Sequence, residues 1–137
     1  MTAKGTKMKT IEEVREFFAK DRFAKDAGAV IEEIGDGYAK CSILLDERHL
    51  NAIGAVMGGV HFVLADFAFA VAANWQELGC VSLNSSISFL DVVKGKKMIA
   101  EARCIKEGRT TNFYQIDISD ELGNRVAVVN ITGFRKR

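Results

Sequence analysis

The longest apolar stretch of the chain covers residues 58–74 and is interrupted by a single acidic residue, Asp66. Its seventeen residues exceed the length of a typical strand and are rich in alanine, so the pattern predicts a helix that opens at Gly58-Gly59 and ends before Gly79. Apolar residues on every face predict a helix that is buried all round. A buried carboxylate costs several kcal/mol unless it is paired, hydrogen-bonded or used in chemistry. Asp66 is therefore the first candidate functional residue.

A short helix and a series of strands are predicted on either side of this stretch. Thr10 followed by Glu13 fits a capping box, and an apolar stripe at helical spacing follows it, which indicates a short N-terminal helix. Residues 29–45 are extended and alternate in polarity, with a turn at residues 35–37. Extended runs, separated by turn residues, then follow near residues 81–90, 97–106, 110–119 and 125–134. Their alternation of apolar and polar positions is typical of an antiparallel sheet with one buried face.

These elements together predict an α+β fold. One face of one sheet cannot cover a helix that is apolar all round, so we expect a curved antiparallel five-stranded sheet wrapped around the long helix. A second copy of the chain would cover what remains. A curved sheet also has free edges, which are natural pairing surfaces. We therefore expect residues 1–137 to form a single domain that assembles as a homodimer, and further as a dimer of dimers.

Composition narrows the class of partner. A formal net charge of +1 gives no broad basic field for nucleic acid or for an acidic membrane surface. The long apolar run contains Asp66 and falls short of the ~20 residues that span a bilayer. Three widely spaced cysteines and two histidines predict neither a disulfide framework nor a metal site. Free thiols and the absence of an apolar leader favour a reducing, cytoplasmic location.

The residues that open the long helix resemble the active-site motif of a known family. Asn51, Gly54, Gly58-Gly59 and Asp66 follow the spacing of the hotdog-fold acyl-CoA thioesterases of the phenylacetate-degradation (PaaI-like) type. The motif of that family reads approximately Asn-x-x-Gly-x-x-His-Gly-Gly, with an acid nine residues after the histidine, as Asp66 follows Met57 here. Met57 itself replaces the usual histidine.

The resemblance extends over most of the chain. Residues 86–90 match a strand that enters a proline-rich turn in the family, although this chain has Asp91-Val92 there and no proline. Gly108-Arg109 matches a hairpin, and the order of elements is the hotdog order. The resemblance implies an enzyme that hydrolyses an acyl-CoA to free acid and coenzyme A. It implies no cofactor beyond the coenzyme A of the substrate. It also implies active sites that are built across a dimer interface.

The chemistry of the motif supports this interpretation. The first N–H groups of a helix are free and carry partial positive charge, and a glycine lets a carbonyl approach closely, so Gly58 is the candidate oxyanion donor. Asp66 would act either as general base for water or as nucleophile, and both alternatives stay open. The two residues are separated by eight positions, or roughly 12 Å along a helix. A site that uses both must therefore combine two chains.

Further candidates surround the motif. Asn51 could position the carbonyl or the water, and Ser82 matches a serine that holds water in some relatives. Each could equally have a structural role only, Asn51 in shaping its turn and Ser82 as an ordinary hydroxyl of its strand. The other expected substrate-binding residues are Met57, Gly59, Phe62, Asn84, Gly108, Arg109 and Thr110. Candidates for the phosphates of coenzyme A, or merely solvated charges, are Lys106, Arg109, Arg135, Lys136 and Arg137.

Several alternatives accompany these assignments. Asp66 could be a structural carboxylate bonded to the backbone, to Ser82 or to Asn84, and the glycine pair could serve only close packing. His61 is turned about 140° from Asp66 around the helix, which favours a core or interface histidine. A non-catalytic acyl-CoA binder is the second function class, favoured by the absence of the motif histidine. A hotdog dehydratase or hydratase ranks last, because no histidine is placed to serve Asp66.

Overall fold

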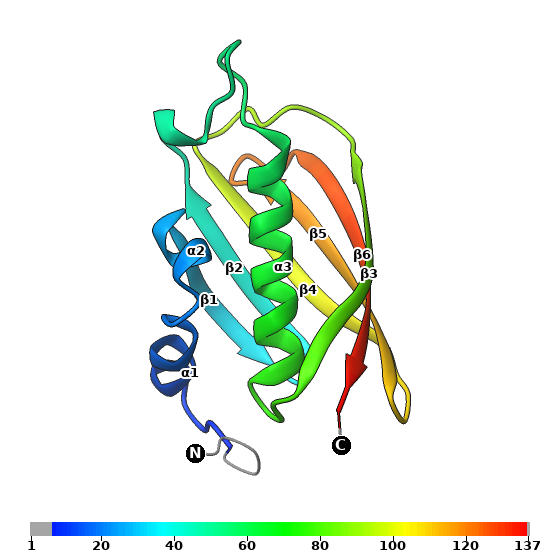
Figure 1. Ribbon diagram of the computed structural model, residues 1–137. Helices are drawn as coiled ribbons and strands as arrows, with labels where there is room; N and C mark the ends of the chain where they lie inside the picture. The colour runs from blue at the N-terminus through cyan, green and yellow to red at the C-terminus, as the bar shows by residue number, and fades with distance from the viewer. Residues whose placement is uncertain (1–6, 137) are drawn as a thin grey trace.

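The computed structural model describes residues 7–136, in which one antiparallel sheet carries a long helix on one face (Figure 1). The six strands lie in the order β1-β2-β4-β5-β6-β3, so β1 and β3 are the edges of the sheet. The helices are α1 (Ile11–Phe18), α2 (Arg22–Asp26) and α3 (Gly58–Asn74), with a single 3-10 turn, η1 (Glu47–His49). The strands are β1 (Ala29–Gly35), β2 (Tyr38–Leu44), β3 (Cys80–Phe89), β4 (Lys97–Glu107), β5 (Thr111–Asp120) and β6 (Arg125–Arg135).

The strand count corrects the prediction of five strands. The segment 29–45 folds back on itself as a hairpin, in which Gly35 pairs with Tyr38 and Ala29 pairs with Ile43. Gly37 makes this turn with a φ of +61°, a value that favours glycine, and a Cβ there would lie 2.9 Å from the Cβ of Cys104. The turn at residues 35–37 was recognised in the sequence, but it joins two paired strands.

The N-terminal helix forms as its sequence predicts. The backbone N–H of Glu13 donates to Oγ1 of Thr10 at 3.1 Å, and the N–H of Thr10 donates to Oε1 of Glu13 at 3.0 Å, which completes the capping box. Val14 and Phe18 form its buried face. The five-residue helix α2, which the apolar pattern did not indicate, follows α1, and both helices contact β1 at one edge of the sheet.

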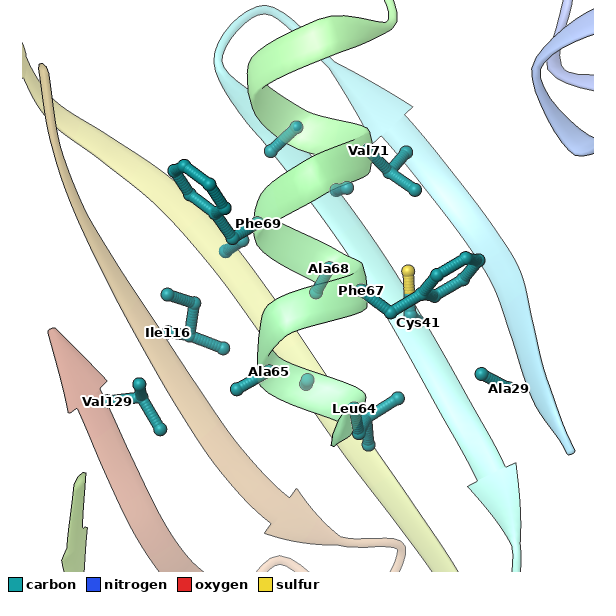
Figure 2. Packing of buried hydrophobic residues seen from close by; sticks show 14 of the residues in the cluster. Ala29, Cys41, Leu64, Ala65, Phe67, Ala68, Phe69, Val71, Ile116 and Val129 are labelled. Carbon is teal, nitrogen blue, oxygen red and sulfur yellow. The ribbon is translucent and has the colours of Figure 1, made fainter. Parts of the chain in front are cut away.

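Helix α3 covers the residues predicted for it and packs chiefly against β4 and β2. Figure 2 shows how it fills the core, with Phe69 directed toward the side of β5 and β6 and Phe67 directed toward the side of β1 and β2. Leu64, Ala65 and Ala68 are fully buried between them.

One strip of α3 stays uncovered in the single chain. Gly59 and Asp66 on this strip are exposed, and Phe62, Val63 and Ala70 are only half-buried. In one chain the sheet covers only one side of the helix, so the prediction that a second copy of the chain covers the remaining side stays a prediction. The strip that remains open is the one that carries the carboxylate.

Candidate functional site

Gly58 is the first residue of α3 and lines a pocket of about 820 Å³ at the N-terminal end of the helix. Met57 precedes it as N-cap residue, with a backbone N–H that donates to the carbonyl of His49 at 2.9 Å. The Met57 side chain makes no capping hydrogen bond, so it does not occupy the amide groups of the first turn. Within that turn the N–H of Val60 donates to Met57 O at 3.0 Å. This end of α3 can therefore present amide donors to a ligand in the pocket.

Two aromatic rings form the wall of the pocket beside Gly58. A Cβ added at Gly58 would lie 3.1 Å from Cζ of Phe89, so the glycine also allows close helix–strand packing. His61 stacks edge-on against Phe89, with ring centroids 5.2 Å apart. Its Nδ1 lies 3.3 Å from Met57 O, and because a carbonyl only accepts, Nδ1 carries the proton. Burial lowers the pKa of His61, so the ring is neutral at pH 7.

The loop before α3 is shaped by Asn51. Its Oδ1 accepts the backbone N–H groups of Ile53 and Ala55, each at 3.0 Å, and its own N–H donates to the carbonyl of Ala55 at 2.7 Å. Asn51 therefore has the turn-shaping role that the sequence left as an alternative, and its Nδ2 is the group that could contact a substrate. Gly54, with a φ of +86°, closes the same turn.

Asp66 lines a second pocket, of about 450 Å³, which lies between α2 and α3. The apolar part of its wall comes from Phe62, Val63 and Phe67 of α3 and from two residues of α2, and Asp21 also lines it. Although Asp66 is exposed as a residue, α2 and the neighbouring rings partly bury its carboxylate; this partial burial raises the pKa of Asp66, and the negative charge of Asp21 raises it further. A carboxylate with a raised pKa is a stronger base once it is ionised.

The pockets at Gly58 and at Asp66 share no lining residue. Within residues 7–136, no hydrogen bond joins Asp66 to Ser82 or Asn84, so the structural alternative that used those residues gains no support. The predicted Phe62 lines the Asp66 pocket, whereas Met57 and Gly59 lie at the start of α3, where Met57 Cε lies 3.0 Å from the position of a Cβ on Gly59.

The other predicted site residues lie away from both pockets in one chain. Ser82 and Asn84 are exposed on the edge strand β3, on either side of a bulge. The hairpin with Gly108, Arg109 and Thr110 lies near the end of the molecule that holds the C-terminus of α3, opposite Gly58 (Figure 1). One chain does not bring these residues to the pocket at Gly58 or to the pocket at Asp66.

Arg135 has a structural position, which corrects its assignment as a candidate for phosphate binding. The side chain is 5% exposed, and its guanidinium donates to the carbonyls of Glu77 at 2.6 Å and Ala73 at 2.7 Å. Its Nε donates to Glu107 at 3.3 Å. Lys106, Arg109 and Lys136 are exposed, and Arg137 lies outside the described residues.

Sequence reasoning missed two features of the site. The sequence correctly placed His61 on a different face of the helix from Asp66. Its place in the Gly58 pocket depends on where β3 ends, and the pattern of apolar and polar residues does not predict that. Asp21 and α2 were also missed, although an Asp before a short polar stretch and Gly28 after it are ordinary helix boundary signals. Among residues 7–136, no group of three or more potential ligand residues could hold a metal ion. No helix in that range is long and apolar enough to cross a membrane.

Comparison with known proteins identifies the family. A model of the thioesterase superfamily matches residues 53–127. A putative esterase of Archaeoglobus fulgidus is 32% identical over 136 residues, which cover 98% of this chain and 87% of that protein. The acyl-coenzyme A thioesterase PaaI of Escherichia coli is 32% identical over 112 residues, which cover 81% of this chain and 80% of that one.

Solved structures agree with the sequence comparison. The structure of Escherichia coli PaaI matches with a TM-score of 0.84 at 29% identity, over 89% of each chain. A Streptococcus pneumoniae protein described as a hypothetical thioesterase, solved with coenzyme A, matches with a TM-score of 0.78 at 27% identity, over 87% of this chain and 96% of that one. The hotdog resemblance is therefore confirmed, and the chain belongs to the thioesterase superfamily as a PaaI-like member.

Proposed function

We propose that this protein hydrolyses acyl-CoA thioesters to free acid and coenzyme A at sites composed of two chains. The observation that carries the proposal is the position of Asp66, a carboxylate with a raised pKa on the uncovered strip of α3. A relative that is 32% identical is named an acyl-coenzyme A thioesterase, which supports the substrate class. The three free cysteines fit a reducing, cytoplasmic setting.

The reaction requires a polarised carbonyl and an activated attacking group. The N–H of Gly58 would donate to the thioester oxygen and stabilise the negative charge that develops on it. Asp66 of the other chain would take a proton from water as the water oxygen bonds to the carbonyl carbon. The C–S bond then breaks, and the thiolate of coenzyme A leaves and takes up a proton. In the alternative route, Asp66 attacks the carbonyl directly, the C–S bond breaks and the thiolate of coenzyme A leaves and takes up a proton, and water then hydrolyses the resulting anhydride to the free acid and the Asp66 carboxylate.

A second chain is required for geometric reasons. Gly58 and Asp66 lie roughly 12 Å apart along one helix, which is too far for both to act on one carbonyl. Strand β3 forms an open edge of the sheet and is exposed along almost its whole length, including Val81 and Leu83. Such an edge is suited to pairing with a copy of itself about a two-fold axis. We propose that this pairing forms the dimer and that the partner covers the uncovered strip of α3.

The remaining candidate residues take their roles within this dimer. Asn51 would hold the carbonyl or the water through Nδ2, while Ser82 and Asn84 would contribute from the paired edges. Gly108, Arg109 and Thr110 would reach a substrate bound at a neighbouring chain. A dimer of dimers remains a further proposal of the same kind.

A panel of acyl-CoAs with aromatic, short-chain and medium-chain acyl groups tests the function. Release of free thiol is measured for each substrate with the wild-type chain and with Asp66→Asn. We expect turnover of at least one class by the wild type and a large loss in the variant. Binding of acyl-CoA by calorimetry without thiol release from any member would favour the non-catalytic binder instead. The non-catalytic binder is the second candidate function because Met57 replaces the motif histidine.

A further inference from the structure

The pocket beside Asp66 contains a second carboxylate, Asp21, from a different element. Asp21 is the N-cap residue of α2, yet its side chain makes no capping hydrogen bond in the described chain. Its backbone is held on both sides, because its N–H donates to Phe18 O at 3.0 Å and its carbonyl accepts from Lys25 N at 3.0 Å. The backbone at Asp21 is therefore held in place beside the pocket, and its exposed carboxylate does not cap the helix that it begins.

The other charged group of this pocket is already paired. Arg22 lines the pocket, but its guanidinium lies 3.6 Å from the carboxylate of Asp26, and both side chains are largely exposed. The remaining lining residues are apolar: Phe23 and Ala24 of α2, and Phe62, Val63 and Phe67 of α3. Two carboxylates thus share a largely apolar pocket, and neither is ion-paired within residues 7–136.

Like charges at one site oppose each other's ionisation. Burial and the charge of Asp21 both raise the pKa of Asp66, in that order of size, and burial raises the pKa of Asp21. Once ionised, Asp66 is then more basic than an isolated aspartate. A stronger base, or a stronger carboxylate nucleophile, accelerates attack on the thioester.

We propose that Asp21 belongs to the reaction centre as a positioning residue, which acts through Asp66 and shares with it the pocket between α2 and α3. The inference rests on the proposed function of Asp66. Asp21 does not itself contact the thioester. It makes the short helix α2, which is otherwise a surface element, part of the catalytic apparatus of the chain.

A direct titration tests the proposal on the full chain. The ¹³C resonance of the Asp66 carboxyl carbon is followed against pH in the wild type and in Asp21→Asn, an isosteric change that leaves the backbone of α2 in place. Removal of the Asp21 charge should lower the pKa of Asp66. The matched control is Asp36→Asn, an exposed aspartate in the turn between β1 and β2, which should leave the titration of Asp66 unchanged. An unchanged titration in Asp21→Asn, with the same thermal midpoint as the wild type, overturns the proposal.

The pH profile of kcat/KM separates this inference from the proposed function. In Asp21→Asn the acidic limb should move to lower pH while the plateau falls by a factor of about two to five, because the base is weaker. A purely structural effect would lower the plateau without moving the limb, and that result overturns the proposal. A shifted Asp66 titration with an unmoved acidic limb shows instead that Asp66 does not limit the rate. It therefore removes the proposed role of Asp66 together with the place of Asp21 in the reaction centre.

Discussion

At the scale of single residues, the interest of this chain lies in where charge and backbone donors are placed on α3. Asp66 occupies the exposed strip of the helix, and Gly58 occupies its uncapped N-terminus. Each has a structural feature that suits catalysis: a raised pKa for the carboxylate and amide donors for the glycine. Substitutions at these and neighbouring positions give separate tests.

The change Asp66→Asn should abolish most thioesterase activity without affecting the fold. Asparagine keeps the size and most of the hydrogen-bonding capacity, but it cannot act as base or nucleophile. A positioned base contributes about 10²–10⁴ to the rate, so turnover should fall by that factor. Thiol release and the thermal midpoint are measured together. More than about a tenth of wild-type turnover would make Asp66 a structural residue.

The change Met57→His tests the missing motif histidine. The Met57 side chain is 53% exposed and makes no capping bond, so histidine can replace it without disturbing the core. If the proposed chemistry needs only Gly58 and Asp66, the rate should stay the same or rise modestly. Steady-state kinetics on the best substrate decides the question. Activity that is present only in Met57→His would identify the natural chain as a degenerate enzyme or a binder.

The change Gly133→Ala should destabilise the sheet. A Cβ at this position on β6 would collide with Oδ1 of Asn112 and lie 3.0 Å from both Cys80 Sγ and Phe69 Cζ. Overpacking of this kind costs about 1–3 kcal/mol. Chemical denaturation measures the free energy of unfolding, with Thr132→Ala at the neighbouring, less buried position as control. If the two changes lower the free energy of unfolding equally, the close packing around Gly133 does not account for the loss of stability.

At the scale of elements, α3 is fixed at its two ends by different means. Its N-terminus is joined to the preceding loop by the bond from Met57 N–H to His49 O, whereas Arg135 of β6 donates to the carbonyl of Ala73 in its last turn and to that of Glu77 just beyond it. A cation at this end also interacts favourably with the helix dipole. Helix position, and with it the position of Asp66, therefore depends on the last residue of the last strand.

The change Arg135→Met should reduce stability by about 2–4 kcal/mol, because it leaves the carbonyls of Ala73 and Glu77 without their donor. Thermal unfolding measures the loss, and Lys136→Met, at the exposed neighbouring position, provides the control. Below the unfolding transition, KM for acyl-CoA should stay unchanged in Arg135→Met. If KM rises while the variant is still fully folded, Arg135 contacts coenzyme A after all.

At the scale of the whole molecule, the question is how many chains build one site. The uncovered strip of α3, the open edge at β3 and the separation of Gly58 from Asp66 are the observations that favour a second chain in the proposed site. We expect sedimentation as a dimer or tetramer, with no stable monomer at micromolar concentration. Sedimentation velocity over a dilution series tests this expectation.

Complementation gives the sharper test of shared sites. An inactive Asp66→Asn chain is mixed with an inactive Gly58→Val chain, whose added side chain would collide with Phe89 and block the oxyanion position. In a mixed dimer one composite site receives both defects and the other receives none. With equal stability and free exchange, half the dimers are mixed, so roughly a quarter of full activity should return. No recovery despite proven exchange would place each site within one chain.

The sequence by itself determined the elements whose signals are local. The bounds of α3, the capping box of α1 and the alternating strands follow from neighbouring residues. The periodicity of a helix or a strand can be recognised within a short stretch of sequence. The spacing of Asn51, Gly58 and Asp66 carried the family resemblance for the same reason.

Only the tertiary structure decided which surfaces meet. The apolar pattern of α3 does not reveal that the sheet lies on one side of the helix and leaves Asp66 on the open strip, because this coverage depends on the path of strands that lie far from α3 in the sequence. Long-range packing likewise made Arg135 a helix anchor and placed His61 in the Gly58 pocket. It also brought Asp21 to Asp66, since α2 and α3 are joined through the β1–β2 hairpin and are placed by their contacts with the sheet. Local residues thus fixed the elements, and burial of their apolar faces against one another fixed which side chains share a pocket.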